Sequence, residues 1–256
     1  MKTAVKHMVA RMFLWIRDLL DPAVNFEEVS VLCYHSVSDA SSDTVVSKNA
    51  FERHLALLKK SGMSIVPLSD VVAWVRGEKT LPRKAVALTF DDGYADFETT
   101  VVPILERYQA SATVFVVGDE SAARACLGND TSLLSGEAIE RLRANPLIEV
   151  GYHSRTHANL AKLSGEALKR EVGQPEGMNY FAYPGGNHSP DATRTIREAG
   201  YQAAFSIHPG LVRRASDRFL MPRNVILNAM PLWQVRVRAT KAIDWYRFTT
   251  RCIKKL

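Results

Sequence analysis

The chain has 256 residues and a formal net charge of +6, and 46% of its residues are hydrophobic while 23% are charged. This composition suffices for one enzyme domain with a sizeable core, and it excludes an intrinsically disordered chain. The sequence shows no internal repeat, which excludes a solenoid. Its three cysteines, Cys33, Cys126 and Cys252, have no close spacing. We therefore expect packing or surface thiols rather than a disulfide framework, and a cytoplasmic protein or one at the cytoplasmic membrane surface.

Residues 1–22 predict an amphipathic N-terminal helix. Apolar side chains recur at helical spacing between Val5 and Leu20, and four basic residues interrupt any continuous apolar run. This pattern fits neither a cleavable signal peptide nor a membrane-spanning helix, because both need a longer uncharged stretch. The helix is expected either to pack on the following domain or to lie on a membrane surface, and the sequence favours neither.

Residues 23–230 predict a catalytic domain in which strands and helices alternate. Apolar runs typical of strands cover residues 31–35, 63–67, 85–90, 112–117, 147–151, 180–183 and 201–206. Helical patterns include residues 50–60, 96–108, 135–143 and 190–199. The alternation predicts an α/β fold with a parallel barrel. Because active sites form beyond the carboxyl ends of such strands, the polar residues that follow each run are candidates for the site.

The strand predicted at 85–90 leads into the sequence TFDDG, in which Asp91 and Asp92 are adjacent. Two carboxylates at a buried strand end repel each other unless a cation or a proton separates them. An Asp-Asp-Gly sequence is also typical of an ordinary turn, so further ligands are needed. After the strand predicted at 147–151, the sequence HSRTH places His153 and His157 four residues apart.

A set of two histidines and one carboxylate is a common zinc site that makes a bound water nucleophilic. We therefore predict Asp92, His153 and His157 as ligands of one divalent metal, most simply zinc. This leaves Asp91 free to act as the general base that takes the proton from that water.

A third motif, FAYPGG, follows at residues 181–186, where glycine allows the backbone to approach a ligand closely. With TFDDG, HSRTH and FAYPGG in this order, the chain resembles the NodB-type polysaccharide deacetylases from about Ser30 to Leu227. The resemblance implies an irregular (β/α) barrel of about seven strands and the activity of a metal-dependent carbohydrate N-deacetylase. It agrees with the roles predicted above for the two aspartates and the two histidines.

The resemblance also implies contacts of the third motif with the substrate. Tyr183 and Pro184 belong to the motif, and the backbone N–H of Gly185 is expected to stabilise the oxyanion. Two departures from the family pattern stand out. Ala182 occupies the place of an arginine that usually orients the base, and Asn228 replaces the usual late histidine that protonates the leaving amine.

Substitutes for both missing groups are present elsewhere. Arg223 follows the apolar residues 219–222 and is a candidate to hold Asp91 in bidentate geometry, although a surface role is an alternative. His35 ends the strand predicted at 31–35, and the first and last strands of a closed barrel are neighbours, so we predict it as the general acid. The alternative is a histidine that merely ends a strand. A similar Tyr-His strand begins the branch that deacetylates poly-N-acetylglucosamine. His188 and His208 lie in loop-like sequence and are expected at the surface.

Residues 231–256 predict a basic C-terminal helix or tail. From Arg236 onward, seven Lys and Arg residues face only Asp244, so this segment carries the whole net charge of +6. Interleaved aromatic residues suit an anionic membrane surface, where each basic residue contributes about 1 kcal/mol. A solvated helix face is the alternative. Nucleic acid is not an expected partner, because the sequence has no recognisable binding module.

Two classes of function remain open. The first is a metal-dependent hydrolase that removes an N-acetyl group from an amino sugar in a glycan or glycolipid, with deformylation of a lipid-linked amino sugar as its nearest rival. The second is a catalytically degenerate protein that binds a saccharide or a membrane. The intact aspartates and histidines favour the first class, whereas Ala182 and Asn228 keep the second open.

Overall fold

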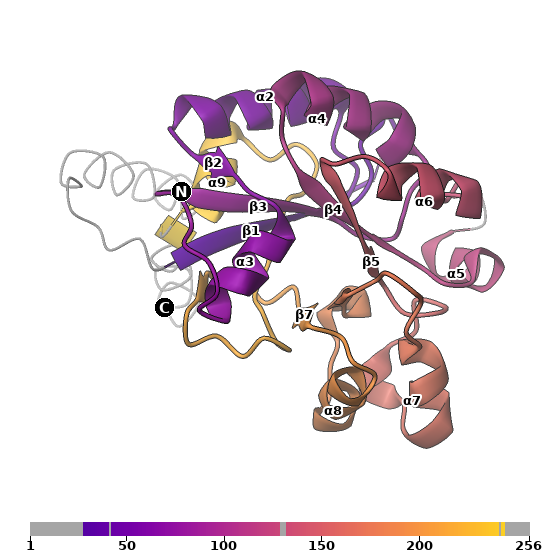
Figure 1. The fold of residues 1–256 in the computed structure, drawn as a ribbon. Coiled ribbons are helices and arrows are strands. Elements are labelled where there is room, and N and C mark those ends of the chain that lie inside the picture. Colours follow the sequence, from indigo (N-terminus) through magenta and orange to yellow (C-terminus); the bar gives the residue numbers. More distant parts are fainter. Residues whose placement is uncertain (1–27, 41, 129–131, 241, 244–256) are drawn as a thin grey trace, which may run out of the picture.

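The strands form one curled sheet, seen in a computed structural model that describes residues 28–40, 42–128, 132–240 and 242–243 (Figure 1). The strands are β1 (Glu28–Tyr34), β2 (Ser64–Ile65), β3 (Ala85–Phe90), β4 (Ala112–Val116), β5 (Ile148–Tyr152), β6 (Tyr180–Ala182), β7 (Ala203–Phe205), β8 (Val212–Arg213) and β9 (Asn224–Val225). Their order is β7-β6-β5-β4-β3-β1-β8, while β2 also pairs with β3 and β9 with β1. Among these strands the pairs are parallel, apart from β1 with β8.

Residues 221–225 lie between the two ends of the curled sheet. Met221 forms a parallel bridge to Phe205 at the end of β7, and Asn224 pairs with Leu32 in the middle of β1. One short segment therefore connects β7 to β1, as the twist of a strongly curved sheet allows. The predicted α/β fold with an irregular barrel of about seven strands is confirmed.

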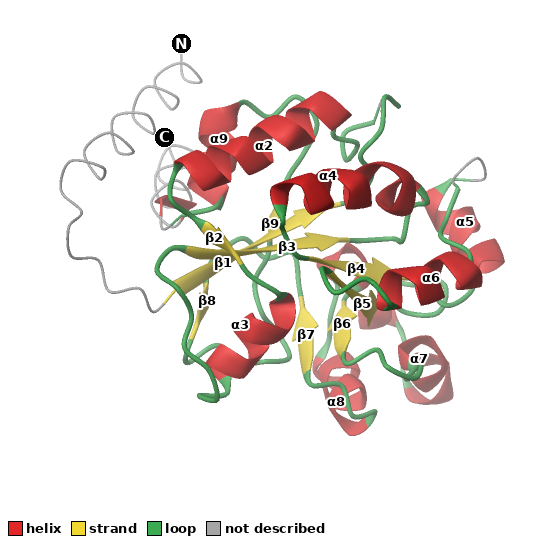
Figure 2. Cartoon of the chain, turned by 45° about the horizontal axis from the view of Figure 1, so that its top comes forward, coloured by secondary structure: helices red, strands yellow, loops and turns green. Residues whose placement is uncertain are grey.

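Helices cover the sheet on both sides (Figure 2). They are α2 (Lys48–Lys60), α3 (Leu68–Val75), α4 (Val102–Tyr108), α5 (Glu120–Leu127), α6 (Gly136–Arg143), α7 (Gly165–Val172), α8 (Pro190–Glu198) and α9 (Leu232–Arg238). A π-helical turn at Phe97–Val101 leads directly into α4. The helical patterns in the sequence correspond to α2, to this turn with α4, to α6 and to α8, but they did not include α3, α5 or α7.

Alternate residues of each central strand face two different hydrophobic clusters, as the period of two of a β-strand requires. Leu32 and Leu88 pack outward in the cluster shared with α2, α4, α6, α7 and α8. Val31 and Ala87 pack inside the curl, in a cluster that also contains buried side chains of β4, β6 and β7. Helix α3 adds four buried side chains to this inner cluster. It therefore closes the inside of the sheet, whereas α2, α4, α6, α7 and α8 cover its outside.

A glutamate from a distant strand caps α3. The residue at its N-terminus is Pro67, which offers no side-chain acceptor to the free N–H groups. Instead, the Glu149 carboxylate on β5 accepts hydrogen bonds from the backbone N–H groups of Leu68 (3.0 Å) and Ser69 (3.2 Å) and from the Thr113 hydroxyl (2.7 Å). A carboxylate at a helix N-terminus is favourable because it opposes the positive end of the helix dipole.

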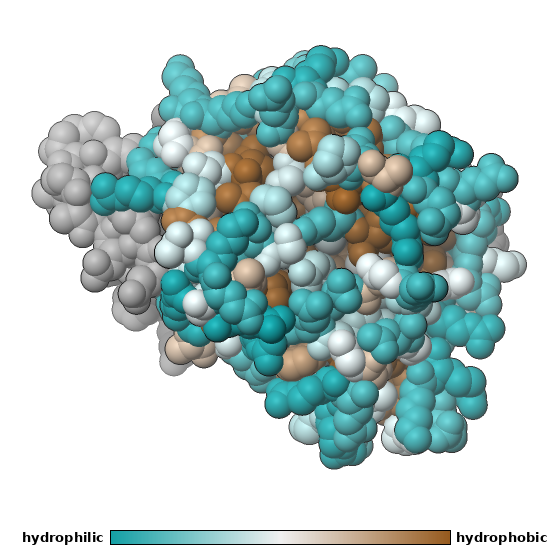
Figure 3. Space-filling model, in the orientation of Figure 1, coloured by the Kyte–Doolittle hydropathy of each residue, from teal (hydrophilic) through white to brown (hydrophobic). Residues whose placement is uncertain are grey.

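The terminal segments predicted from the sequence fall mostly outside the described residues. The N-terminal helix at residues 1–22 lies entirely outside them, as does the tail from residue 244 onward. Within the predicted basic segment the structure shows α9, which packs against α2. None of the helices in the described part of the chain has the length and apolar character needed to span a membrane. On the face seen in Figure 3, hydrophilic residues predominate.

The buried histidine His54 predicts a pH dependence of folding stability. Its ring is 2% exposed, and Nδ1 lies 3.4 Å from the Tyr34 hydroxyl. Burial, together with the nearby Arg53, lowers its pKa to about 4. His54 therefore binds a proton near pH 6.5 in the unfolded chain but only near pH 4 in the folded chain. Folding stability consequently falls as the pH drops through this window.

Replacing His54 by Leu should remove this contribution. Between pH 6.5 and pH 4 the free energy of unfolding should fall in both proteins. We expect the fall to be smaller in the variant than in the parent, by up to about 3 kcal/mol. Urea denaturation across this range measures the difference, because other titrating groups contribute equally to both proteins. Parallel pH profiles of the two proteins would show that His54 is readily protonated in the fold.

Candidate metal centre and active site

The predicted site residues converge at the carboxyl ends of the parallel strands. Sheet pairing continues one residue beyond β3, where the Asp91 N–H donates to the Tyr34 carbonyl at 2.9 Å. It also continues beyond β5, where the His153 N–H donates to the Val116 carbonyl at 2.8 Å. Because the backbone is still held by the sheet at these positions, both side chains start from rigid points.

Asp92, His153 and His157 form one cluster. Oδ1 of Asp92 lies 3.4 Å from Nε2 of His153 and 3.3 Å from Nε2 of His157. One donor atom from each residue lies within 4.8 Å of the other two. Nδ1 of His153 lies 2.8 Å from the Ala182 carbonyl, which fixes Nδ1 as the protonated nitrogen and leaves the Nε2 lone pair facing Asp92. Asp92 and His153 are buried, while the His157 side chain is 21% exposed and opens the cluster to solvent.

The cluster fits a divalent cation by two observations. Oδ1 of Asp92 is buried and has no hydrogen-bond partner in the protein, which is rare for a buried carboxylate oxygen. Burial lowers the pKa of His153, but the Asp91 and Asp92 carboxylates outweigh burial and raise it above its ordinary value. The cluster thus favours added positive charge, and its two nitrogens and one oxygen are donors that zinc accepts.

The backbone around the cluster adopts conformations that side chains usually avoid. Asp92 (φ 73°), Ser154 (φ 63°) and His157 (φ 60°) all lie in the left-handed region. Such residues cost on the order of 1–3 kcal/mol each and persist where the surrounding structure imposes them, as happens at functional sites. At Asp92 the left-handed backbone sets its side chain apart from that of Asp91, so that two adjacent carboxylates serve different partners.

Asp91 forms a buried ion pair with Arg223. Oδ1 and Oδ2 accept hydrogen bonds from Nη1 (2.6 Å) and Nη2 (2.7 Å), which is the bidentate geometry expected from the sequence. Both side chains are nearly inaccessible, at 3% and 0% exposure. Burial raises the pKa of Asp91, but the Arg223 guanidinium outweighs it and holds the pKa below its ordinary value. Asp91 is therefore ionised near neutral pH.

The guanidinium is itself fully supported inside the curl of the sheet. Nε of Arg223 donates to the Ser206 carbonyl at 3.1 Å, and Nη1 also donates to the Thr89 hydroxyl at 3.2 Å. The Phe115 ring lies 5.3 Å below the guanidinium carbon. These contacts fix the plane of the guanidinium and hence the direction of the carboxylate that it holds.

His35 and Cys33 complete the surroundings of Asp91. A ring nitrogen of His35, the Cys33 sulfur and a carboxylate oxygen of Asp91 lie within 4.8 Å of one another. His35 is partly exposed, and its Nδ1 is buried without a hydrogen-bond partner. The Cys33 thiol lies 3.4 Å from Oδ2 of Asp91, and burial raises the pKa of this thiol. Cys33 therefore stays protonated and donates to the carboxylate.

Sequence reasoning assigned Cys33 only to packing. The strand period contained the missing signal, because Cys33 pairs in register with Thr89 and so faces the same side as Thr89 and Asp91. The other described cysteine, Cys126, is exposed as expected.

Comparison with known proteins identifies the family. The sequence matches the polysaccharide deacetylase family over residues 78–204. The chain belongs to the polysaccharide deacetylase family. It is 23% identical over 214 residues to the poly-β-1,6-N-acetyl-D-glucosamine N-deacetylase of Staphylococcus aureus (strain MRSA252), covering 75% of this chain and 71% of that protein. The fold is similar to that of the Streptococcus pyogenes deacetylase PplD in complex with acetate, with a TM-score of 0.73 at 20% identity, covering 83% of this chain and 98% of that one.

A second relative matches a shorter region more strongly. The poly-β-1,6-N-acetyl-D-glucosamine N-deacetylase of Escherichia coli (strain K12) is 39% identical over 90 residues. The match covers 34% of this chain but only 13% of that protein, so it concerns one part of a much longer relative.

In the third motif, FAYPGG, the Tyr183 side chain and backbone N–H form hydrogen bonds within the protein. The Tyr183 side chain is completely buried, and its hydroxyl donates to the Phe219 carbonyl at 2.9 Å. Its N–H donates to the Phe205 carbonyl at 3.0 Å. The expected substrate contact of Tyr183 is therefore not supported, because its ring and N–H are both used within the protein. Pro184 is also buried, whereas Gly185 is exposed with φ 59°.

The departures from the family pattern have simple structural counterparts. Ala182 is buried in the cluster inside the curl, and the arginine that holds Asp91 is instead Arg223, directly before β9. Asn228 is exposed, its side-chain oxygen accepts from the following backbone N–H, and its own N–H donates to the Asp43 carbonyl. His208 is exposed as expected, and His188 is partly buried with its ring 5.5 Å from that of His208.

Substituting Asp92 by Asn should abolish retention of a divalent metal, because the cluster loses its only anionic donor. Metal analysis after gel filtration checks this, with the Asp119→Asn variant, altered at the N-terminus of α5, as a matched control. Metal affinity should also fall as the pH drops, since protons compete for the two imidazoles. Unchanged metal content in the Asp92 variant would show that another group of residues holds the ion.

Proposed function

We propose that the protein is a metal-dependent hydrolase that removes an N-acetyl group from an amino sugar of a glycan. One observation carries this proposal: two adjacent carboxylates have different partners. Asp91 is held by Arg223, and Asp92 faces two imidazoles. Metal-dependent amide hydrolysis uses a base and a Lewis acid in close proximity, and this arrangement provides a place for each. Membership of the polysaccharide deacetylase family supports the same substrate class.

In the proposed mechanism Asp92, His153 and His157 hold a divalent metal, most simply zinc. When bound, such an ion polarises the amide carbonyl and lowers the pKa of water. Asp91 takes one proton from the water that attacks the acetyl carbon, and its low pKa keeps it ionised and ready. His35 donates a proton to the sugar nitrogen as the carbon–nitrogen bond breaks. Acetate and the free amine are the products.

Arg223 acts in this mechanism by positioning the base. Its bidentate contact prevents the Asp91 carboxylate from rotating. Oδ1 keeps a further lone pair for the water, whereas Oδ2 also accepts from the Cys33 thiol. The Cys33 thiol restrains the same carboxylate from β1. Gly185 is the remaining candidate in the third motif for stabilising the oxyanion through its N–H.

Deformylation uses the same groups on a smaller acyl substituent, so it is the nearest rival reaction. A catalytically degenerate saccharide-binding protein is the rival outside the enzymes. The ordered Asp91–Arg223 pair weighs against the second rival, because burying two charges has no evident benefit for binding alone.

Acetate release from an N-acetylglucosamine oligomer tests the proposal directly. The metal-loaded protein should release acetate, and the Asp91→Asn variant should lose at least about a hundredfold in kcat while it still binds metal. Because this variant removes the negative charge that faces Arg223, circular dichroism should be used to check that it is still folded. Formate release from an N-formyl analogue without acetate release would favour the deformylase. Neither product from the metal-loaded protein would favour the degenerate binder.

Replacing His35 by Ala should lower kcat by roughly 10²–10⁴ with metal binding intact, because the leaving nitrogen loses its proton donor. The His208→Ala variant is a matched control, as His208 is exposed in the loop after β7. Near-normal turnover of the His35 variant would remove this residue from the mechanism.

We also propose that the protein acts at a cytoplasmic membrane surface on a glycan or glycolipid. Support comes from the sequence of the basic tail, where residues 244–256 carry four Lys or Arg and one Asp. Binding to vesicles should require anionic lipid and weaken with salt. Co-sedimentation should compare the full chain with one that ends at residue 243. The cut preserves α9, whose Arg238 carbonyl accepts from the Ser30 hydroxyl at 2.6 Å. Equal sedimentation of both proteins would contradict this role of the tail.

A further inference from the structure

A polar pocket lies at the edge of the sheet opposite the candidate active site. It has a volume of about 280 Å³ and is lined by Val75, Arg197, Arg214, Ser216, Asp217, Arg218 and Phe219. Arg218 donates to the carbonyl of Gln202, directly before β7, and Arg197 is in the last turn of α8. Strands begin at this edge, whereas Asp91 follows the carboxyl end of β3. A strand of five residues spans roughly 17 Å, so the pocket is separate from the candidate metal centre.

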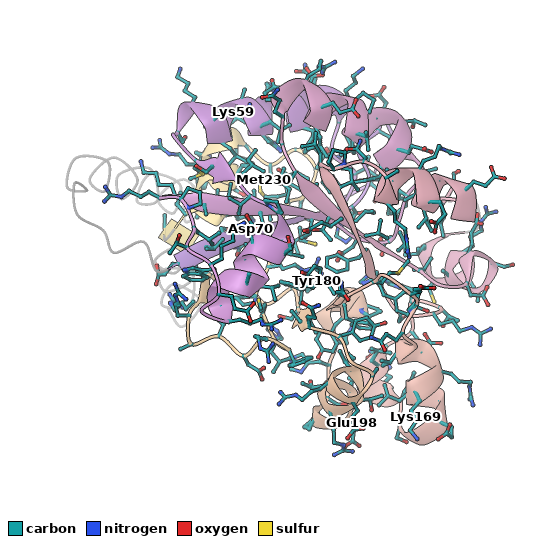
Figure 4. All side chains as sticks on the ribbon, in the orientation of Figure 1. Lys59, Asp70, Lys169, Tyr180, Glu198 and Met230 are labelled. Carbon is teal, nitrogen blue, oxygen red and sulfur yellow. The ribbon has the colours of Figure 1, made fainter. Side chains whose placement is uncertain are left out.

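Aromatic rings hold the three arginines of this pocket. The guanidinium carbon of Arg214 lies 5.1 Å from the centre of the Trp74 ring, and Nη1 donates to the Trp74 carbonyl at 2.7 Å. Arg197 and Arg218 lie 4.6 Å and 5.8 Å from the centre of the Phe219 ring. Stacking occupies the faces of the guanidinium groups and leaves most of their N–H edges free for other acceptors. Side-chain nitrogen atoms gather between α3 and α8 in Figure 4.

The pocket has more positive than negative charge. Asp217 is the only carboxylate in its lining, so three guanidinium groups exceed the negative charge by two. Oδ1 of Asp217 already accepts the Phe219 N–H at 2.9 Å, and Nη2 of Arg197 lies only at 3.7 Å from it. One carboxylate that is turned toward its own backbone cannot neutralise three arginines.

We propose that this pocket binds a phosphate group. Each guanidinium can direct two parallel N–H donors at two oxygens of one phosphate. A phosphate monoester or inorganic phosphate carries about 1.5 to 2 negative charges near neutral pH, which matches the excess, whereas a carboxylate carries only one. The Ser216 hydroxyl accepts from the Arg213 N–H at 2.9 Å and can donate its own proton to a phosphate oxygen.

The location has a consequence for the proposed hydrolysis. A phosphate bound at the edge where strands begin leaves the catalytic edge open, so substrate and phosphate bind independently. Variants of the pocket should therefore keep full activity on a short soluble oligomer. This readout separates failure of the pocket proposal from failure of the proposed deacetylase function.

Calorimetric titration of the full chain with inorganic phosphate at constant ionic strength tests the proposal. We expect saturable binding of one phosphate, weakened at least about tenfold in each of the variants Arg214→Gln and Arg218→Gln, which remove a charge-assisted donor. Arg141→Gln is the matched control, since Arg141 on α6 pairs with Glu98. Asp92→Asn must also keep phosphate binding, which excludes the metal centre as the site.

Vesicles distinguish the source of the phosphate. Co-sedimentation with phosphatidylcholine vesicles that contain phosphatidic acid, weaker in the two pocket variants than in the parent, would assign a lipid phosphate, because the basic tail contributes equally to all three proteins. Binding of inorganic phosphate without such co-sedimentation would assign a soluble phosphate. The proposal is overturned if no saturable binding occurs up to about 10 mM phosphate. A site with a Kd of about 1 mM would be nearly saturated at that concentration. It is equally overturned if both pocket variants bind as the parent does.

Discussion

The buried ion pair between Asp91 and Arg223 is the interaction on which the catalytic end of this fold depends. Removing two charges from water costs several kcal/mol per ion, and only near-ideal geometry with further hydrogen bonds compensates. Here both carboxylate oxygens are bonded, and the guanidinium has further acceptors in the Ser206 carbonyl and the Thr89 hydroxyl. The pair joins β3 to the segment that connects β7 with β1. It therefore fixes both the carboxylate proposed as the base and the closure of the sheet.

The adjacent aspartates differ because their surroundings differ. Asp91 continues the β3 backbone into the inside of the curl, where Arg223 lowers its pKa. Asp92 turns away through a left-handed backbone conformation. Burial raises the pKa of its carboxyl, but His153 and His157 outweigh burial and lower that pKa below its ordinary value. Both carboxylates are thus ionised side by side, which is tolerable only because each has its own positive partner or an ion. The two roles proposed for these identical side chains therefore rest on their different surroundings.

Short-range sequence patterns predicted the parts of the site that depend on strand ends. An apolar run followed by Asp-Asp or by His-x-x-x-His sets the position of the side chains, because parallel strands end at one edge. The same reasoning placed Arg223 after an apolar stretch and beside Asp91, where the structure has it. The barrel itself followed from the alternation of strand and helix patterns.

Features that depend on distant contacts were not predictable in this way. Helix α3 is a run of mostly apolar residues without a local cap, and its N-terminus is held by Glu149 from β5. Tyr183 belongs to a motif that suggests substrate contact, yet its hydroxyl and N–H are bonded to Phe219 and Phe205 across the fold. Cys33 became informative only through its register with Thr89. In each case the deciding partner lies many residues away, and no local pattern encodes it.

A double-mutant cycle on the unfolding free energy tests the central ion pair most directly. The single variants Arg223→Met and Asp91→Leu each leave one buried charge without a partner, so each should lose about 3–5 kcal/mol in urea denaturation. The double variant should regain most of that loss, because it removes both charges together. Losses that simply add in the double variant would show that the two side chains contribute independently, and the account of the site built on their pairing would be wrong.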